Sequence, residues 1–442
     1  MPDRGPHWSS RLPFYYGWVI VGIAFVTMAI GVTARTAFSL LMPPLIDEFH
    51  WDRGLAAGAF SFGFLVSAVL SPIVGRVIDL RGPRIVIMCG VVLTTAGLFL
   101  APYIERPWHL YATLGVLVGG GANMMTYTVH SQFLPNWFVA RRGLAISIAF
   151  AGAGIGAIVL LPWLESIILL HGWRAACWAI GLFVLFAVAP PNLLVRKKPE
   201  DVGLLPDGVS ASPAAAAKQH SNIVDADWAA TEWTLARASR TARFWWIAIG
   251  YFCALVAWYA VQVHQTQYLT EIGFAPLVAA WALGAVSVIG ILGQVILGGL
   301  SDRIGREWIW TVGCGGFAVS YAALIVMEHA PSTAFLYAMV ISQGFFGYAL
   351  ASVMGAIVAE IFEGPHFGSI FGTITVALIG GGAAGPWFAG AIHDATGSYR
   401  LAFVLIIICC FISAVAIWLA APRKVRVVAG QLPRTSGGCS AD

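Results

Sequence analysis

The sequence predicts an all-α integral membrane protein with twelve transmembrane helices in two six-helix pseudo-repeats. Three observations support this: the composition, the spacing of the charged residues and a repeated motif. Of the 442 residues, 59% are hydrophobic and 10% are charged, whereas ordinary soluble domains carry roughly 25% charged residues. Lipid accepts apolar side chains on the outside of a protein as readily as on the inside. The composition therefore excludes a soluble enzyme and a nucleic-acid-binding protein.

The transmembrane helices are expected where charged residues are absent. Such a helix needs about 20 mostly apolar residues. Twelve stretches reach this length without Asp, Glu, Lys or Arg, and in chain order they are residues 12–34, 54–75, 85–104, 107–140, 143–164, 175–195, 244–270, 272–301, 308–327, 329–359, 364–393 and 401–422. The longest ones must include loop residues. The first is a full span rather than a short apolar segment with a cleavage site, so we expect no signal peptide.

The basic residues indicate how the spans are oriented. If the N-terminus lies inside, 20 of the 25 Lys and Arg residues fall on the cytoplasmic side, four fall on the opposite side, and Arg35 lies within the membrane. Cytoplasmic loops of membrane proteins carry an excess of Lys and Arg. We therefore expect a multi-pass protein of the cell inner (plasma) membrane with both termini in the cytoplasm.

These observations divide the chain into five parts. We expect a cytoplasmic N-terminal tail at residues 1–13, a six-helix half at 14–195, a cytoplasmic linker at 196–243, a second six-helix half at 244–422 and a cytoplasmic C-terminal tail at 423–442. The centre of the linker is rich in Ser, Ala and Pro, which is typical of a connection between domains.

A short motif follows both the second and the eighth expected span, displaced by 223 residues. Its first copy contains Gly75, Asp79, Gly82 and Arg84, and its second copy contains Gly298, Asp302, Arg303, Gly305 and Arg306. Two related halves in parallel orientation are a known transporter architecture, in which the substrate site lies at the membrane midplane between them.

The two motif aspartates need a compensating partner. Asp79 and Asp302 fall at the C-terminal ends of their helices, where the helix dipole disfavours negative charge. Each is expected to bind a neighbouring Arg, such as Arg84 or Arg306, or the N-terminus of another helix. The second glycine of each motif allows a tight turn. We expect a latch that closes the cytoplasmic side in one conformation, and the alternative is a basic loop that only fixes orientation.

Arg35 is the one charged residue expected at the middle of the membrane. It lies eight residues before Pro43, or about 12 Å from the outer end of a span in a hydrocarbon core roughly 30 Å thick. A midplane Arg costs at least ~2.5–3.5 kcal/mol, and no Asp or Glu is expected at this depth. We expect Arg35 to face a watery cavity and to bind a carboxylate. The alternative is an Arg held by helix carbonyls or by polar groups of neighbouring spans.

Other polar residues of the expected spans could line the same cavity. They are Tyr127, His264, Gln294, Tyr348 and Ser352. A histidine is suited to proton coupling near neutral pH, and the alternative is that His264 belongs to the water-facing end of a helix. Tyr348 and Ser352 are four residues apart and share a helix face, and packing is the alternative role for the tyrosines and the serine. No Cys or His spacing suggests a metal site, and we expect no metal ion or cofactor.

The motifs together resemble a known family. The two loop motifs resemble the signature loop of the major facilitator superfamily. Further matches to monocarboxylate transporters and bacterial oxalate/formate-type permeases are the segments 16–21, 136–145, 199–208 and 385–399. The resemblance implies the major facilitator fold, alternating access and a substrate- and proton-binding role for a basic residue of span 1, to which Arg35 looks similar.

The resemblance fails at one place. Monocarboxylate transporters commonly carry an Arg in span 8 with a proton-accepting Asp one turn earlier, and Gln294 and Gly290 look like the residues at these positions here. Gln294 could still donate a hydrogen bond to a carboxylate. The usual proton site is missing, so proton symport is an open question.

We therefore expect a secondary active transporter of small organic anions, mono- or dicarboxylates, with a proton or an exchanged anion as the coupling partner. Its expected partners are a small carboxylate and the lipid bilayer, with no nucleic acid, and we expect a monomer. Two alternatives are an exporter of neutral or apolar molecules and a non-transporting receptor. An enzyme is not expected, because the spans contain no carboxylate pair, metal cluster or activated nucleophile.

Overall fold

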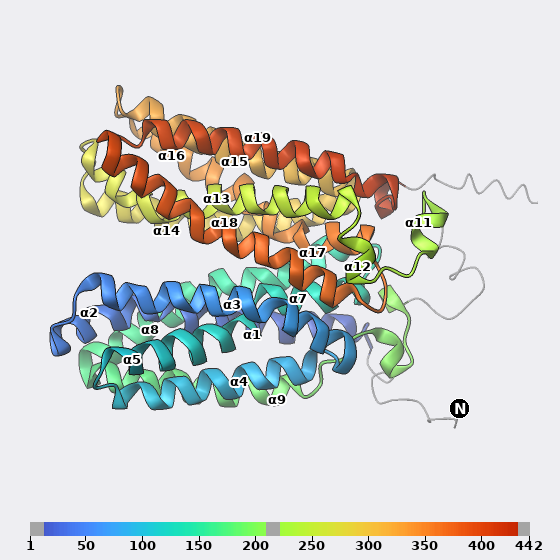
Figure 1. Cartoon of the computed structure of the whole chain (residues 1–442), viewed down its shortest axis with the longest axis horizontal. Coiled ribbons are helices and arrows are strands. Elements are labelled where there is room, and N and C mark those ends of the chain that lie inside the picture. The colour runs from blue at the N-terminus through green and yellow to red at the C-terminus, as the bar shows by residue number, and fades with distance from the viewer. Residues whose placement is uncertain (1–12, 209–221, 432–442) are drawn as a thin grey trace, which may run out of the picture.

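The computed structural model describes residues 13–208 and 222–431, and this part of the chain is almost entirely helical (Figure 1). The expected N-terminal tail and parts of the expected linker and C-terminal tail therefore lie outside the described residues. A single antiparallel bridge between Ile223 and Arg426 is the β structure in the described part.

The first group of helices contains α1 to α9. Its α-helices are α1 (Gly17–Thr36), α2 (Phe38–Phe49), α3 (Arg53–Arg81), α4 (Pro83–Leu100), α5 (Pro107–Leu110), α6 (Gly120–Asn123), α7 (Tyr127–Trp137), α8 (Arg142–Phe183) and α9 (Ala189–Asn192). Its 3-10 helix is η2 (Ala101–Tyr103), and its π-helices are η3 (Tyr111–Gly119) and η4 (Val184–Val188).

The second group contains α13 to α19. Its helices are α13 (Ala242–Glu271), α14 (Pro276–Ile304), α15 (Arg306–Met327), α16 (Thr333–Ile341), the π-helix η7 (Ser342–Gly347), α17 (Ala349–Ile361), α18 (Phe367–Thr396) and α19 (Arg400–Ala420). In chain order, the first group is followed by η5 (Pro199–Val202), η6 (Pro206–Gly208), α11 (Ala226–Ala230) and α12 (Leu235–Ala238). The second group is followed by η8 (Pro422–Lys424) and η9 (Ala429–Gln431).

Ten helices among the described residues are long and apolar enough to cross a membrane, whereas the sequence predicts twelve spans. One difference arises because Arg142–Asn192 counts as a single segment, although Gly172 inside it has φ 82° and ψ 165°, which is not helical. The other arises because the expected span 107–140 is divided into α5, η3, α6 and α7. Charge-free runs therefore locate apolar segments but do not show where the helix inside them breaks.

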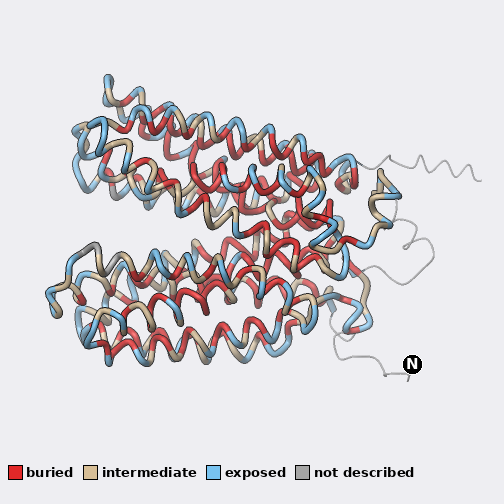
Figure 2. Tube along the Cα trace, viewed as in Figure 1, coloured by how far each residue is buried: buried red, intermediate tan, exposed pale blue. Residues whose placement is uncertain are grey.

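The two groups lie side by side and approach each other at one end (Figure 1). We call this the linker end, because α11 and α12 lie there, and we call the end near α2 the distal end. Contacts between the groups are made mainly by α3 with α18 and by α8 with α14. Figure 2 shows buried residues inside each group and, toward the linker end, also between the groups.

Glycines make the contacts between the groups close. A Cβ atom on Gly75 would collide with the backbone of Gly368, and one on Gly143 would collide with the carbonyl of Gly298. Because no side chain separates these backbones, the helices approach closely enough for side chains of one group to reach backbone N–H groups of the other.

Candidate functional site

Arg35 lies in the last turn of α1 without an acidic partner. Its guanidinium carbon lies 3.9 Å from the centroid of the Phe64 ring on α3, which is a cation–π contact. The Nη2 atom is buried and has no hydrogen-bond partner, and Arg35 is absent from the ion pairs of the described residues. A buried donor without an acceptor is costly, so this guanidinium is suited to an acceptor that the protein does not supply.

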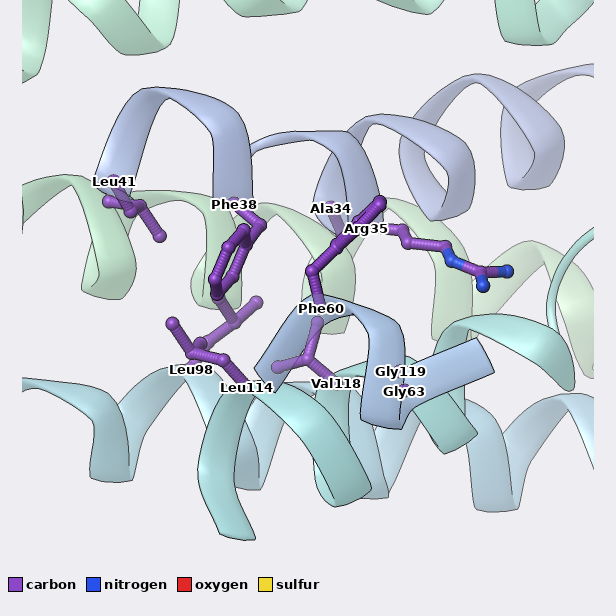
Figure 3. Close-up of a pocket in the computed structure, with 10 residues that line it drawn as sticks. All are labelled: Ala34, Arg35, Phe38, Leu41, Phe60, Gly63, Leu98, Leu114, Val118 and Gly119. Carbon is purple, nitrogen blue, oxygen red and sulfur yellow. The ribbon is translucent and has the colours of Figure 1, made fainter. Parts of the chain in front are cut away.

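A small pocket lies beside the stem of this side chain. Its volume of about 10 Å³ is close to the space that one water molecule needs. Its lining is mainly apolar and includes Phe38, Leu41 and Leu114. Figure 3 shows the guanidinium pointing away from these residues. The small pocket is therefore not where an anion would meet the charge.

A tyrosine of the second group, Tyr259, lies next to Arg35, and two further tyrosines interact with Tyr259. Arg35 interacts electrostatically with Tyr259 on α13, and Tyr127 on α7 interacts with Tyr259 and with Tyr348. The Tyr259 ring also meets the Phe64 ring edge to face, with the centroids 6.0 Å apart. Of the predicted residues, Tyr127 and Tyr348 thus lie near Tyr259, which interacts with Arg35.

Sequence reasoning missed Tyr259. The available signal was its phenol group in the interior of the expected span 244–270, but nothing in the sequence places α13 next to α1. Tyr127 is 37% exposed while it interacts with tyrosines of the other group, so we infer that its exposed part faces the space between the groups.

Two of the tyrosine hydroxyls make no hydrogen bond to the described residues. In the described part of the chain, no hydrogen bond is made by the hydroxyl of Tyr127 or of Tyr259, whereas Tyr348 Oη accepts from Gln262 Nε2 at 2.6 Å. Together with Arg35 Nη2, the unengaged hydroxyls form a set of donors that lacks an acceptor. A carboxylate carries two acceptor oxygens and a negative charge, and it is the complement of this set.

Gly290 has a steric reason to be glycine. A Cβ atom at this position would collide with the ring of Tyr348, and that ring stacks on Trp258 with the centroids 4.4 Å apart and the planes at 15°. The ring of Tyr348 therefore occupies the space into which a longer side chain at position 290 would project. The position of the Tyr348 ring therefore explains why span 8 has a glycine and not an aspartate at position 290.

Two predicted residues are engaged in helix packing nearby. Ser352 is buried, and its hydroxyl donates to the backbone carbonyl of Gln294 at 3.0 Å. This bond joins α17 to α14. Gln294 itself is 5% exposed. Because the Ser352 hydroxyl is already bonded, its observed role is structural.

His264 is bonded within the second group. Its Nε2 lies 2.9 Å from the carbonyl oxygen of Pro386, and its Nδ1 lies 3.1 Å from Tyr399 Oη. A carbonyl only accepts, so Nε2 carries the proton and donates. His393 stacks on the same tyrosine and lies 3.8 Å from Glu271. The structure therefore places His264 in a separate polar cluster and not with Arg35.

Both motif aspartates bind the N-terminus of a helix in the other group. Asp79 Oδ1 accepts from the backbone N–H of Gly368 at 2.7 Å, and its Oδ2 accepts from the N–H and hydroxyl of Ser369 at 2.7 and 2.6 Å. Asp302 accepts from the N–H groups of Gly143 and Leu144 at 2.8 and 3.1 Å. The first turns of α18 and α8 supply unpaired N–H groups and a favourable dipole for these carboxylates.

The basic residues around the two aspartates differ. Arg306 is buried and binds Asp302 at 2.7 Å and Glu360 at 2.8 Å. Arg84 and Arg303 are exposed and take part in none of the ion pairs of the described residues. Near Asp79 the cation is instead Lys197.

Sequence reasoning missed Lys197, which follows the sixth expected span. Its Nζ donates to the backbone carbonyl of Asp79 at 3.1 Å and lies 3.9 Å from Oδ1. Burial lowers the pKa of Lys197, and the neighbouring Asp79 carboxylate opposes this shift. Two motifs that look alike in the sequence therefore use different cations.

Comparison with known proteins identifies the family. The model of the Major Facilitator Superfamily matches residues 23–342 and 247–439. The chain belongs to the major facilitator superfamily. The resemblance of the motifs to this superfamily is confirmed, and the protein is a multi-pass membrane transporter and not an enzyme, because members of the superfamily are transporters.

Curated relatives support the same membership. Monocarboxylate transporter 13 of Rattus norvegicus is 25% identical over 398 residues, which cover 88% of this chain and 85% of the relative. Monocarboxylate transporter 12 of Homo sapiens is 25% identical over 408 residues, with 88% and 77% covered.

Solved structures share the fold of this superfamily member. The proton:xylose symporter XylE has a TM-score of 0.72 at 13% identity, with 91% of this chain and 95% of that chain covered. The transporter FucP in the outward conformation has a TM-score of 0.66 at 16% identity, with 91% and 98% covered.

Proposed function

We propose that the protein carries small organic carboxylates across the membrane and that Arg35 binds the carboxylate with the help of Tyr127 and Tyr259. The observation that carries this proposal is the missing partner of Arg35 Nη2. A charged Arg in the membrane normally faces a cavity and a partner. Here the groups that interact with the guanidinium are the Phe64 ring and the Tyr259 phenol, which supply no negative charge, so the substrate supplies it.

The proposed cycle is alternating access. We assign the linker end to the cytoplasm, because the basic residues concentrate there and cytoplasmic loops carry such an excess. The contacts of Asp79 and Asp302 across the groups hold this end closed in the present conformation. Arg35 and the tyrosines come from both groups, so separating the groups at the linker end would open the same site to the cytoplasm.

We further propose that exchange of anions is faster than net transport. An empty site leaves the Arg35 charge uncompensated when both ends are closed, and such a charge is costly away from water. A carboxylate that stays bound while the transporter returns to its starting conformation removes this cost. The space at Gly290 that would hold a proton-accepting aspartate is occupied by the ring of Tyr348. This disfavours the coupling of transport to protons through span 8.

A second candidate function is the export of neutral or apolar molecules. The observation that favours it is the number of aromatic rings near Arg35, with Phe64 against Tyr259 and Trp258 stacked on Tyr348, which would suit an apolar substrate. The two functions differ in whether the substrate must carry a negative charge.

The test is uptake into proteoliposomes of labelled carboxylates, each paired with its uncharged amide. The amide keeps the size of the carboxylate and loses its charge. We expect uptake of at least one carboxylate and no competition by its amide. If amides or uncharged aromatic compounds are carried as fast as the acids, the carboxylate proposal is wrong and the export of neutral molecules is favoured.

A further inference from the structure

Each group of helices carries a segment that crosses its linker end. The N-brace, residues 193–208, follows α9, and the C-brace, residues 421–431, follows α19. Both follow the last helix of their group, and both return to the C-terminal end of the helix that bears the motif aspartate. In the N-brace, Lys197 bonds to the carbonyl of Asp79. In the C-brace, Gln431 Nε2 donates to the carbonyl of Ile304 at 2.8 Å.

The N-brace also holds the loop in front of α8. Asp207 Oδ2 accepts from the N–H groups of Val139 and Ala140 at 3.0 and 2.9 Å. These residues lie three to five positions before Gly143 and Leu144, whose N–H groups bind Asp302 of the other group. These bonds of Asp207 stay within the first group. They hold in place the loop that leads into α8, and the first N–H groups of α8 donate to Asp302.

The C-brace holds the loop in front of α18 in the same way. Arg426 Nη1 donates to the carbonyl of Glu360 at 2.8 Å, and its Nη2 lies 3.0 Å from Glu363 Oε2. Arg426 is 7% exposed. The loop ends where α18 begins, and Gly368 and Ser369 in its first turn bind Asp79. The brace of each group thus supports the helix N-terminus that receives the aspartate of the opposite group.

We propose that Asp207 and Arg426 are positioning residues of the closed linker end, and that each lengthens the time this end stays closed by fixing one receiving helix N-terminus. This inference rests on the alternating access in the proposed function. If the loop in front of α8 or α18 moves, the N–H groups of that helix no longer stay within reach of the carboxylate. The equilibrium then shifts toward the conformation in which the linker end is open.

The test measures opening of the linker end without any substrate. Ser131 on α7 is 2% exposed and packs against Gly355 of α17 across the two groups. In purified Ser131→Cys protein, a maleimide should react at position 131 only after the groups separate, and the parent chain gives the background from its native cysteines. Asp207→Ala, which removes the accepting oxygen, and Arg426→Gln are then added to Ser131→Cys.

Matched controls lie on the same braces. Asp201 bonds to the N–H of Lys198 inside the N-brace, so Asp201→Ala removes a carboxylate without releasing the loop before α8. Lys424 is exposed and supplies Lys424→Gln for the C-brace. Hydrogen bonds to a charged group contribute enough that losing them should speed labelling about tenfold. The two controls should label at the rate of Ser131→Cys alone.

Labelling of both test variants at the control rate would overturn the proposal. In a variant that unfolds, the maleimide would label all buried cysteines. The labelled fraction of native Cys177, which is buried in α8, detects this. If one variant does not fold, the other decides, because each acts on a different loop. The readout needs no substrate, so faster labelling without carboxylate uptake would leave this inference standing and contradict only the proposed substrate.

Discussion

At the scale of single residues, the site is defined by donors that lack acceptors. Arg35 Nη2 has no partner, and the hydroxyls of Tyr127 and Tyr259 make no hydrogen bond within the described residues. Buried polar groups are normally hydrogen-bonded, so these donors are suited to an acceptor that a substrate brings. The tyrosines also come from different groups of helices, so a carboxylate bound to all three residues would connect the groups.

The first prediction concerns Gly290. Replacing it by Asp restores the carboxylate that monocarboxylate transporters commonly carry, but the Cβ collides with the Tyr348 ring. We expect Gly290→Asp and Gly290→Ala to lower uptake by about tenfold or more, because overpacking costs ~1–3 kcal/mol. The measurement is the initial rate of carboxylate uptake in proteoliposomes.

The control for this prediction is a double variant. Tyr348→Ala removes the ring, so the loss caused by Gly290→Ala should be much smaller in its presence than in the parent chain. Equal losses from Gly290→Ala in both backgrounds would show that the collision with Tyr348 is not the cause.

At the scale of elements, the two motif aspartates have unequal surroundings. Asp302 binds the N-terminus of α8 and the buried Arg306, which also binds Glu360. Asp79 binds the N-terminus of α18 and only the more distant cation of Lys197. Removing one member of a buried charge network leaves the remaining charges imperfectly compensated.

The second prediction follows from this difference. Asp302→Asn should lower the midpoint of thermal unfolding in detergent more than Asp79→Asn does, because breaking a buried ion pair costs about 3–5 kcal/mol. Arg84→Gln should leave the midpoint near that of the parent, since Arg84 is exposed. Equal losses for both aspartates would show that the Arg306 pair adds nothing to stability.

A π-helical segment precedes two of the site tyrosines. η3 ends eight residues before Tyr127, with α6 between them, and η7 ends directly before Tyr348. Such segments shift the rotation of a helix about its axis and occur frequently at functional sites. Each group therefore carries one π-helical segment ahead of a site tyrosine.

At the scale of the whole molecule, the apolar segments were predictable from charge alone, and Arg35 stood out for the same reason. The breaks at Gly172 and within 107–140 were not predictable, because charge-free residues continue through them. Tyr259 and Lys197 were missed because their roles arise from contacts with segments distant in the chain, Arg35 and Asp79. A single sequence carries no signal for such a contact.

The third prediction concerns exchange between the two sides. Proteoliposomes loaded with an unlabelled carboxylate substrate should take up the labelled one roughly tenfold faster than empty vesicles, because the bound anion compensates Arg35 during the return. The measurement is the initial uptake rate with and without internal substrate. Equal rates, or a strong acceleration by an imposed proton gradient alone, would contradict exchange.

The central claim is that Arg35 binds the substrate carboxylate. It is tested most directly by the uptake of a carboxylate substrate into proteoliposomes containing Arg35→Gln, with Arg303→Gln as the control at an exposed arginine. Losing a charge-assisted bond to the substrate should reduce uptake by Arg35→Gln at least tenfold, while Arg303→Gln transports like the parent. Uptake by Arg35→Gln at the parental rate would contradict the claim.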